Sequence, residues 1–306
     1  MEILYQLYTD KYNQIRTDFV RYLYDEIDWN SRLIVIVGAR GVGKTTMILQ
    51  HIKLTNTKNE SLYVAADNTY FSTNSLYDVA SSFSKNGGKV LYIDEVHKYE
   101  NWSKEVKMMY DYLPDLKVIV TGSSILDIIK GSDADLSRRA IRYTLEGLSF
   151  REYLNFSLGL NIRPYSLDEI IAGKVELPKE VNYPIVHFKE YLNKGYFPFF
   201  AEDNYHTRLE NIVNMTLEVD IPTYARMNIS TARKIKKLLY VISHSVPFKP
   251  NFSEIGRAIS ADRSSVADYM VYMEKAKLLQ QLEMASEGMA AVEKVDKIYL
   301  GNTCFI

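Results

Sequence analysis

The amino-acid sequence predicts an α/β protein in which a parallel sheet carries helices on both faces, followed by a mostly helical second half. Short apolar runs, separated by helix-length segments, recur up to about residue 150 and then stop. A glycine-rich loop stands between the first run and a helix-forming segment. Such alternation is typical of strands joined by crossover helices, and it predicts a sheet buried on both faces.

The first 150 residues supply one amphipathic helix and five strands. A helix is expected over residues 1 to 27 because apolar side chains recur every three to four positions, at Ile3, Leu7, Ile15, Phe19, Leu23 and Ile27. Strands are expected at residues 33–37, 62–65, 90–93, 118–120 and 141–145. Right-handed crossovers align the carboxyl ends of parallel strands at one edge, where ligands bind.

The second half predicts helices joined by loops that contain proline and glycine. Helices are expected within residues 149–160, 182–192, 209–219 and 231–243. Residues 194–204, KGYFPFFAEDN, form a connector whose aromatic side chains are expected to pack in the interior. Residues 251–282 predict two more helices, broken near Ser260, with Asp262 as the N-cap of the second.

Composition limits the class of protein. The chain has 306 residues, 47% of them hydrophobic, which is enough for two or three domains. No apolar run approaches the ~18 residues of a membrane span, and residues 1–19 contain charges throughout, so a cytoplasmic protein without membrane contact is expected. One cysteine and five scattered histidines give no zinc pattern, so any metal should have oxygen ligands.

Charge is uneven along the chain. The formal net charge is -1, but residues 222 to 280 hold 10 Lys and Arg against 4 Asp and Glu. Local positive charge favours contact with nucleic acid, whereas an ordinary basic helical face would give the same count.

The strongest motif is the glycine loop, which satisfies G-x-x-x-x-G-K-[ST] between a predicted strand and a predicted helix. Its backbone N–H groups would surround phosphate oxygens, while Lys44 would reach the β- and γ-phosphates and the Thr45 hydroxyl would face Mg²⁺. The predicted nucleotide-binding residues are Gly38, Ala39, Arg40, Gly41, Val42, Gly43, Lys44, Thr45 and Thr46.

Two carboxylates follow the third predicted strand. Asp94 and Glu95 should therefore lie at the same edge of the sheet as the glycine loop. Asp94 would hold Mg²⁺ together with Thr45, and Glu95 would polarise a water molecule for attack on the γ-phosphorus. An NTPase needs such a base, whereas a kinase that acts on small metabolites gains nothing from it.

Further polar residues follow the later strands. Thr121, Ser123 and Ser124 end the fourth predicted strand, where a hydroxyl could orient the attacking water. Arg138 and Arg139 precede the fifth, and an arginine at the transition state is worth ~10³ to 10⁵ in rate.

With GARGVGKTT, YIDEVHKYENW, VTGSS and SRRAIRYTLEGLSFREYL in this order, the chain resembles a family of largely uncharacterised bacterial and archaeal AAA+-type ATPases. The resemblance implies a P-loop ATPase core, a helical lid and a C-terminal winged helix. It gives the boundaries 1–28 for the N-terminal helix, 29–150 for the core, 151–246 for the lid and 247–306 for the winged helix.

The resemblance also implies roles. Lys44 and Thr45 take the phosphate and metal roles, Asp94 and Glu95 the metal and water roles, Ser123 the sensor role and Arg139 the arginine role. Arg138 stands where the family usually has glycine, so either arginine could act, on its own nucleotide or on a neighbour's. Family members often continue into a nuclease-like domain, but this chain has Asn302 in place of an aspartate and ends at Ile306, so no nuclease activity is expected.

The last two predicted helices have helix-turn-helix spacing. In a version that reads DNA, Arg263, Ser264 and Ser265 would open the second helix toward the major groove, with Arg257 near phosphate. Asp268, on the same helix, opposes this, and winged helices also serve as protein contacts.

The predicted function is ATP hydrolysis with Mg²⁺, in which the nucleotide state sets the pose of the C-terminal elements. One alternative is a nucleotide-gated binding switch with negligible turnover. The other is a small-molecule kinase. The expected partners are ATP and, at the winged helix, DNA or a protein, which could be a client or a second copy of the chain.

Overall fold

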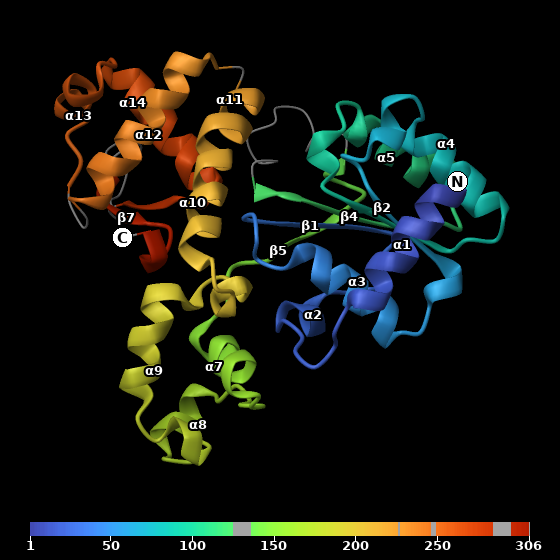
Figure 1. The fold of residues 1–306 in the computed structure, drawn as a ribbon, viewed down its shortest axis with the longest axis horizontal. Coiled ribbons are helices and arrows are strands. Elements are labelled where there is room, and N and C mark those ends of the chain that lie inside the picture. Colours follow the sequence, from blue (N-terminus) through green and yellow to red (C-terminus); the bar gives the residue numbers. More distant parts are fainter. Residues whose placement is uncertain (125–135, 226, 246–248, 284–294, 306) are drawn as a thin grey trace.

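In a computed structural model of the chain, the structure is described for residues 1–124, 136–225, 227–245, 249–283 and 295–305 (Figure 1). The sheet and its helices form one side of the molecule, and the elements after residue 150 form the other. The long helix α10 stands between the sheet and the C-terminal elements.

The sheet is parallel and has five strands, as the sequence predicts. The structure gives their order, β2-β3-β4-β1-β5. The strands are β1 (Leu33–Gly38), β2 (Ser61–Ala65), β3 (Val90–Asp94), β4 (Lys117–Ser123) and β5 (Ile141–Thr144). All six residues of β1 are buried, because helices cover both faces of the sheet. Since β4 lies between β1 and β3, the end of β4 separates the glycine loop from the two carboxylates.

Helices flank the sheet on both sides (Figure 1). On one side lie α1 (Glu2–Gln14), α2 (Leu23–Glu26) and α3 (Lys44–Leu54), and on the other lie α4 (Leu76–Lys85) and α5 (Trp102–Tyr112). This is the two-sided cover that the apolar runs predict.

The prediction of a single helix over residues 1 to 27 is wrong. Helix α1 ends at Gln14, and Ile15 is extended, with φ -72° and ψ 130°. The carbonyl groups of the following segment bond to α3. Gln50, in that helix, donates to the carbonyls of Arg16 and Phe19 at 2.8 Å each. The backbone there bonds to α3 instead of to itself, which ends the helix.

The buried face of α1 also differs from the predicted one. Leu4 and Tyr8 are buried, whereas Ile3 and Leu7 are 55% and 41% exposed. Tyrosines occupy so many positions in this stretch that the apolar spacing alone selects the wrong face.

The helices predicted in the second half are confirmed. They are α7 (Phe150–Leu158), α9 (Pro184–Glu190) continued by the π-helix η6 (Tyr191–Gly195), α10 (Tyr205–Met215) continued by η8 (Thr216–Asp220), and α12 (Ile229–Ser243). The structure adds three short helices that were not predicted, α8 (Leu167–Ile171), η7 (Pro198–Ala201) and α11 (Ile221–Tyr224). Within the described ranges, no helix is long and apolar enough to span a membrane.

The last elements are α13 (Phe252–Ile259), α14 (Arg263–Lys275), β6 (Leu279–Glu283) and β7 (Val295–Leu300). Ser260 breaks the two helices in a left-handed conformation with φ 58°, and Asp262 caps α14 by accepting the N–H of Ser265 at 2.8 Å. Strands β6 and β7 pair antiparallel.

Two hydrophobic clusters divide the chain. One joins the sheet and its helices to α7, to residues as far as Leu209 and to Cys304. The other joins η8, α11 and α12 to α13, α14 and the β6–β7 pair. Helix α12 therefore shares a core with the elements after residue 247, whereas the predicted boundary separates them.

Candidate functional site

The glycine loop connects β1 to α3 at the carboxyl edge of the sheet. Gly41 and Gly43 have φ values of +78° and +100°, in the left-handed region that glycine adopts without strain. These two conformations allow a tight loop before α3, and anion-binding loops of this kind turn their backbone N–H groups toward the anion.

Lys44 fills that loop. Its ammonium donates to the carbonyls of Gly38 and Ala39 at 2.9 Å each. Burial lowers the pKa of Lys44, although the nearby carboxylates of Glu95 and Asp94 oppose the shift. An entering phosphate would give this buried ammonium a stronger acceptor than the two carbonyls.

Asp94 accepts hydrogen bonds from three hydroxyl groups, which lie on helix α3 and on strands β2 and β4. Thr45 Oγ1 donates to Asp94 Oδ2 at 2.7 Å, Tyr63 Oη donates to the same oxygen at 2.7 Å, and Thr121 donates to Oδ1. The structure thus brings together the two predicted metal residues. Tyr63, in β2, belongs to no motif and was not predicted as a partner of Asp94.

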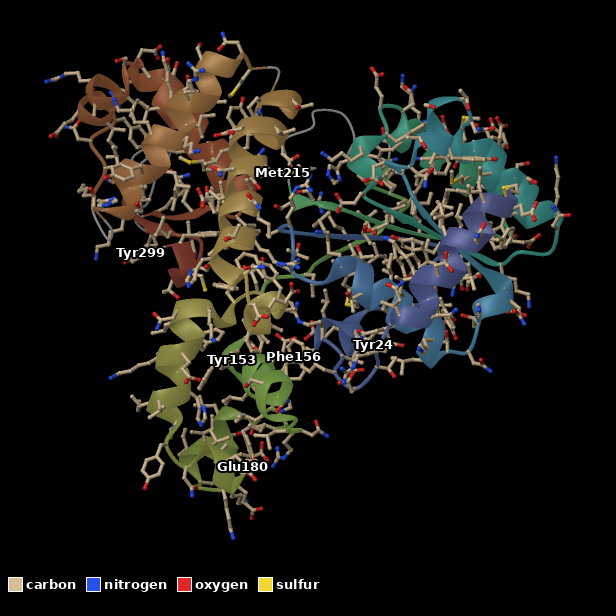
Figure 2. All side chains as sticks on the ribbon, viewed as in Figure 1. Tyr24, Tyr153, Phe156, Glu180, Met215 and Tyr299 are labelled. Atoms are coloured by element: carbon tan, nitrogen blue, oxygen red, sulfur yellow. The ribbon has the colours of Figure 1, made fainter. Side chains whose placement is uncertain are left out.

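Glu95 begins the turn after β3 with φ 54°, a conformation that costs a non-glycine residue about 1–2 kcal/mol. Burial raises the pKa of its carboxyl group, and the charge of Lys44 opposes the shift. Its side chain is 23% exposed and lines a hollow of about 260 Å³ with Arg40, Gly41 and Met215, the last residue of α10 (Figure 2). Strain at this position is typical of functional sites.

Ser123 ends β4 and pairs with Gly38 in the sheet, so the predicted sensor lies beside the glycine loop. His97 lies between it and Glu95: the Ser123 N–H donates to His97 Nδ1 at 3.3 Å, and His97 Nε2 is 3.3 Å from Glu95 Oε2. Sequence reasoning missed His97, since a lone histidine carries no pattern. Its place two residues after Glu95 was the available signal.

Arg40, within the loop, reaches across to the second half of the chain. Its guanidinium contacts both oxygens of Asp220 at 2.7 and 3.0 Å, and Lys98 Nζ contacts Asp220 at 3.2 Å. The Asp220 side chain has no exposed surface. The buried carboxylate of Asp220, on η8, therefore binds Arg40 from the glycine loop and Lys98 from the turn after β3. No sequence motif indicated Asp220.

The connector before α10 covers the loop. A Cβ added at Gly41 would lie 2.8 Å from Phe199 and 3.0 Å from Ile212, so these side chains touch the loop backbone. The connector's aromatics do pack, as predicted, but Phe199 packs on the glycine loop.

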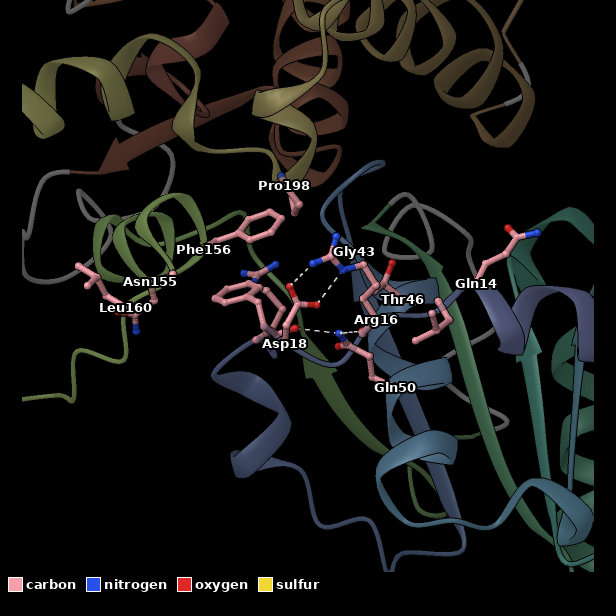
Figure 3. A pocket seen from close by; sticks show the side chains of 14 residues that line it. Gln14, Arg16, Asp18, Gly43, Thr46, Gln50, Asn155, Phe156, Leu160 and Pro198 are labelled. Carbon is pink, nitrogen blue, oxygen red and sulfur yellow. Dashed lines mark hydrogen bonds and ion pairs between the residues drawn. The ribbon is translucent and has the colours of Figure 1, made fainter.

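A second cavity of about 690 Å³ adjoins the start of α3 (Figure 3). Gly43, Thr46 and Gln50 form its floor, and Phe19 and Phe156, whose rings stack at 4.8 Å, line its wall. The volume lies within the ~300–1,000 Å³ range of small-molecule sites. A ligand whose phosphate lies in the glycine loop could extend into this cavity.

Comparison with known families agrees with this geometry. Residues 30–154 match the family model described as an AAA domain. Residues 30–154 are an AAA+-type P-loop domain. Residues 185–305 match a model described as a domain of unknown function.

Two uncharacterized proteins of Methanocaldococcus jannaschii are similar to the chain. One is 25% identical over 285 residues, which is 87% of this chain and 60% of that protein. The other is 28% identical over 175 residues, 55% of this chain and 36% of that protein. The chain thus spans less than two thirds of either relative.

Solved structures with partial likeness include AMPPCP-bound DnaA from Aquifex aeolicus, at 20% identity and a TM-score of 0.34, over 87% of this chain and 91% of that one. The Hsp104–ADP complex of S. cerevisiae has 16% identity and a TM-score of 0.35, over 81% of this chain and 37% of that one.

A buried ion pair supports the AAA+-type domain from behind the loop. Arg21 donates to Glu152 at 2.8 Å and to the carbonyls of Val42 at 2.6 Å and Gly147 at 2.9 Å. Burial alone would raise the pKa of Glu152, but the hydrogen bond and charge of Arg21 hold it below its usual value. Arg21 therefore ties the N-terminal segment, the glycine loop and α7 together.

The structure does not bring Arg139 to the glycine loop of the same AAA+-type domain. Arg139 pairs with Asp111, near the end of α5, at 2.9 Å, and it precedes β5, whose first residue, Ile141, pairs near the start of β1. This is the amino-terminal edge of the sheet, opposite the loop. Arg138 is exposed at the same edge.

The residues proposed to contact DNA lie on α13 and α14, outside the AAA+-type domain. Arg257 and Arg263 are exposed. The hydroxyls of Ser264 and Ser265 donate to the Asp262 cap at 2.6 and 2.9 Å, so both are engaged at the helix start.

Proposed function

We propose that the chain binds Mg-ATP in the glycine loop and hydrolyses it, with Glu95 as the base that polarises the attacking water. One observation carries the proposal: Lys44, Thr45, Asp94 and Glu95 lie together at one rim, with Thr45 and Asp94 joined at 2.7 Å. The ~690 Å³ cavity accommodates the nucleoside.

The residues present fit a magnesium ion. Thr45 offers a hydroxyl and Asp94 a carboxylate, which are the hard oxygen donors that Mg²⁺ prefers, and Mg²⁺ usually takes its other ligands from water and phosphate. When bound, the ion neutralises charge on the phosphates.

Hydrolysis is favoured over transfer to a metabolite by the place of Glu95. Its side chain lines a hollow of about 260 Å³ beside the glycine loop, where a water molecule fits. A kinase that acts on small metabolites would gain nothing from a base at that point.

The Asp220 contacts support coupling between the nucleotide and the second half of the chain. Arg40 lies in the glycine loop and Lys98 in the turn after β3, and both contact Asp220. A phosphate would compete with that carboxylate for the same cations. Nucleotide binding would thus loosen η8 and, through the shared core, α12 to β7.

The helix pair α13–α14, followed by the antiparallel β6–β7 pair, supports a winged helix that contacts DNA through Arg257 and Arg263. Duplex DNA affinity should then fall steeply between about 50 and about 200 mM salt. Binding that is absent, or that does not respond to salt, would leave a protein partner as the ligand of this region.

The hydrolysis proposal is tested by phosphate release from Mg-ATP with no acceptor added. The wild-type chain should release phosphate at a rate well above that of the Lys44→Ala variant, which loses the ammonium in the loop. Equal rates would contradict hydrolysis. If the wild-type chain binds ATP but releases phosphate no faster than Lys44→Ala, the chain is a nucleotide-gated binding switch.

A further inference from the structure

His97 is a buried imidazole that the proposed reaction does not yet use. It lies in the turn that follows β3, two residues after Glu95, and its side chain has no exposed surface. Burial and the charge of Lys98 lower the pKa of His97 to about 3. The ring is therefore neutral at physiological pH and has one N–H donor and one acceptor nitrogen.

The surroundings determine which nitrogen carries the hydrogen. The backbone N–H of Ser123 donates to Nδ1 at 3.3 Å, so Nδ1 is the acceptor. In a neutral ring the hydrogen is then on Nε2. Nε2 lies 3.3 Å from Glu95 Oε2, which puts a carboxylate oxygen within reach of its hydrogen, although the pair does not have hydrogen-bond geometry in this structure.

We propose that His97 is a positioning residue for Glu95: its Nε2–H holds one carboxylate oxygen so that the other oxygen is presented to the attacking water. The inference rests on the proposed hydrolysis. It also links Glu95 to the end of β4, because the same ring accepts the N–H of Ser123. A shift of Ser123 toward a bound phosphate would move the ring and, with it, the carboxylate.

Two physical effects make this contact matter. A hydrogen bond from Nε2 to one carboxylate oxygen leaves the other oxygen of Glu95 as the one that can accept a proton from water. It also restricts rotation of the Glu95 side chain, whose position determines where the attacking water is held. A misplacement of ~1 Å can lower the rate ~10²-fold.

The test compares His97→Leu with His97→Gln in the full chain. Leucine fills much of the space but has no polar atoms. Glutamine can accept from Ser123 and donate to Glu95, so it is the matched control. His97→Leu should lower kcat for phosphate release about 10- to 100-fold with KM for ATP nearly unchanged, whereas His97→Gln should stay within about threefold of wild type. Equal loss in both variants, or normal kcat in His97→Leu, would overturn the proposal.

A second measurement does not depend on turnover. Nitrogen NMR of the chain labelled at its five histidines should show a neutral Nε2–H ring that disappears in His97→Gln and whose Nε2 signal moves in Glu95→Gln. A ring with its hydrogen on Nδ1, or a signal insensitive to Glu95→Gln, would overturn the contact. If the NMR result is as expected but wild type releases no phosphate, the proposed hydrolysis fails and the His97–Glu95 contact stands. If wild type is active and His97→Leu is too, only the His97 inference fails.

Discussion

The guanidinium of Arg40 contacts both carboxylate oxygens of Asp220, a residue 180 positions later in the chain, at 2.7 and 3.0 Å. Arg40 belongs to the glycine loop, and Asp220 ends η8, whose neighbours pack with α12 to α14. The glycine loop and the C-terminal elements are therefore joined by an ion pair whose carboxylate is buried.

Asp220→Asn tests this connection. Removing the carboxylate leaves Arg40 and Lys98 without their shared anion, but both cations are partly exposed, so we expect a loss of about 1–3 kcal/mol in the free energy of unfolding. ATP should bind more tightly, since it no longer competes with Asp220. Urea unfolding and nucleotide titration measure the two effects. Glu218→Gln, in the exposed Lys236 pair, is the control, and an equal loss there would contradict the account.

The same pair predicts a pH dependence. Burial alone would raise the pKa of Asp220, but hydrogen bonds and charge from Arg40, with Lys98, hold it below the usual value. The stabilisation is complete above the unfolded-state pKa of about 3.9 and is lost as the pH falls through the lower folded-state pKa. The difference in unfolding free energy between wild type and Asp220→Asn should therefore shrink on acidification below about pH 4. A difference that grows instead would contradict the pairing.

Arg21 and Glu152 form the other buried pair. Arg21→Met leaves the Glu152 carboxylate buried without its cation and should lower the free energy of unfolding by about 3–5 kcal/mol. The double variant with Glu152→Gln should lose less than the sum of the two single variants, because the stranded charge is gone. Additive losses would show that the two side chains act independently.

Arg139 lies at the sheet edge opposite the glycine loop, so a catalytic role requires a neighbouring copy. We expect a mixture of Lys44→Ala and Arg139→Ala chains to release more phosphate than the two variants measured separately. The intact loop of one chain would then receive the arginine of the other. Arg138→Ala in place of Arg139→Ala is the control. A mixture no more active than its parts would remove Arg139 from the reaction.

The parallel sheet and its rim were predictable because their signals are local. Five apolar runs specify buried strands, and the G-x-x-x-x-G-K-[ST] loop and the Asp94–Glu95 pair each follow one of them. Parallel topology then brings those strand ends to one edge. The Thr45–Asp94 contact follows from these facts without knowledge of the rest of the chain.

The contacts that sequence reasoning missed depend on packing between distant segments. Asp220 is one acidic residue among 38 Asp and Glu, and only the placement of η8 against the loop distinguishes it. His97 required the end of β4 beside the turn after β3. The break after Gln14 depends on contacts with Gln50 of α3, and the pattern of residues 1–27 cannot reveal these contacts.

The central claim is that Glu95 activates water against a nucleotide held by the glycine loop. Steady-state phosphate release by Glu95→Gln, with ATP binding measured on the same preparation, tests it most directly. The substitution keeps the size of the side chain and removes the base, so release should fall at least ~10²-fold while binding persists. Phosphate release at the wild-type rate would contradict the claim.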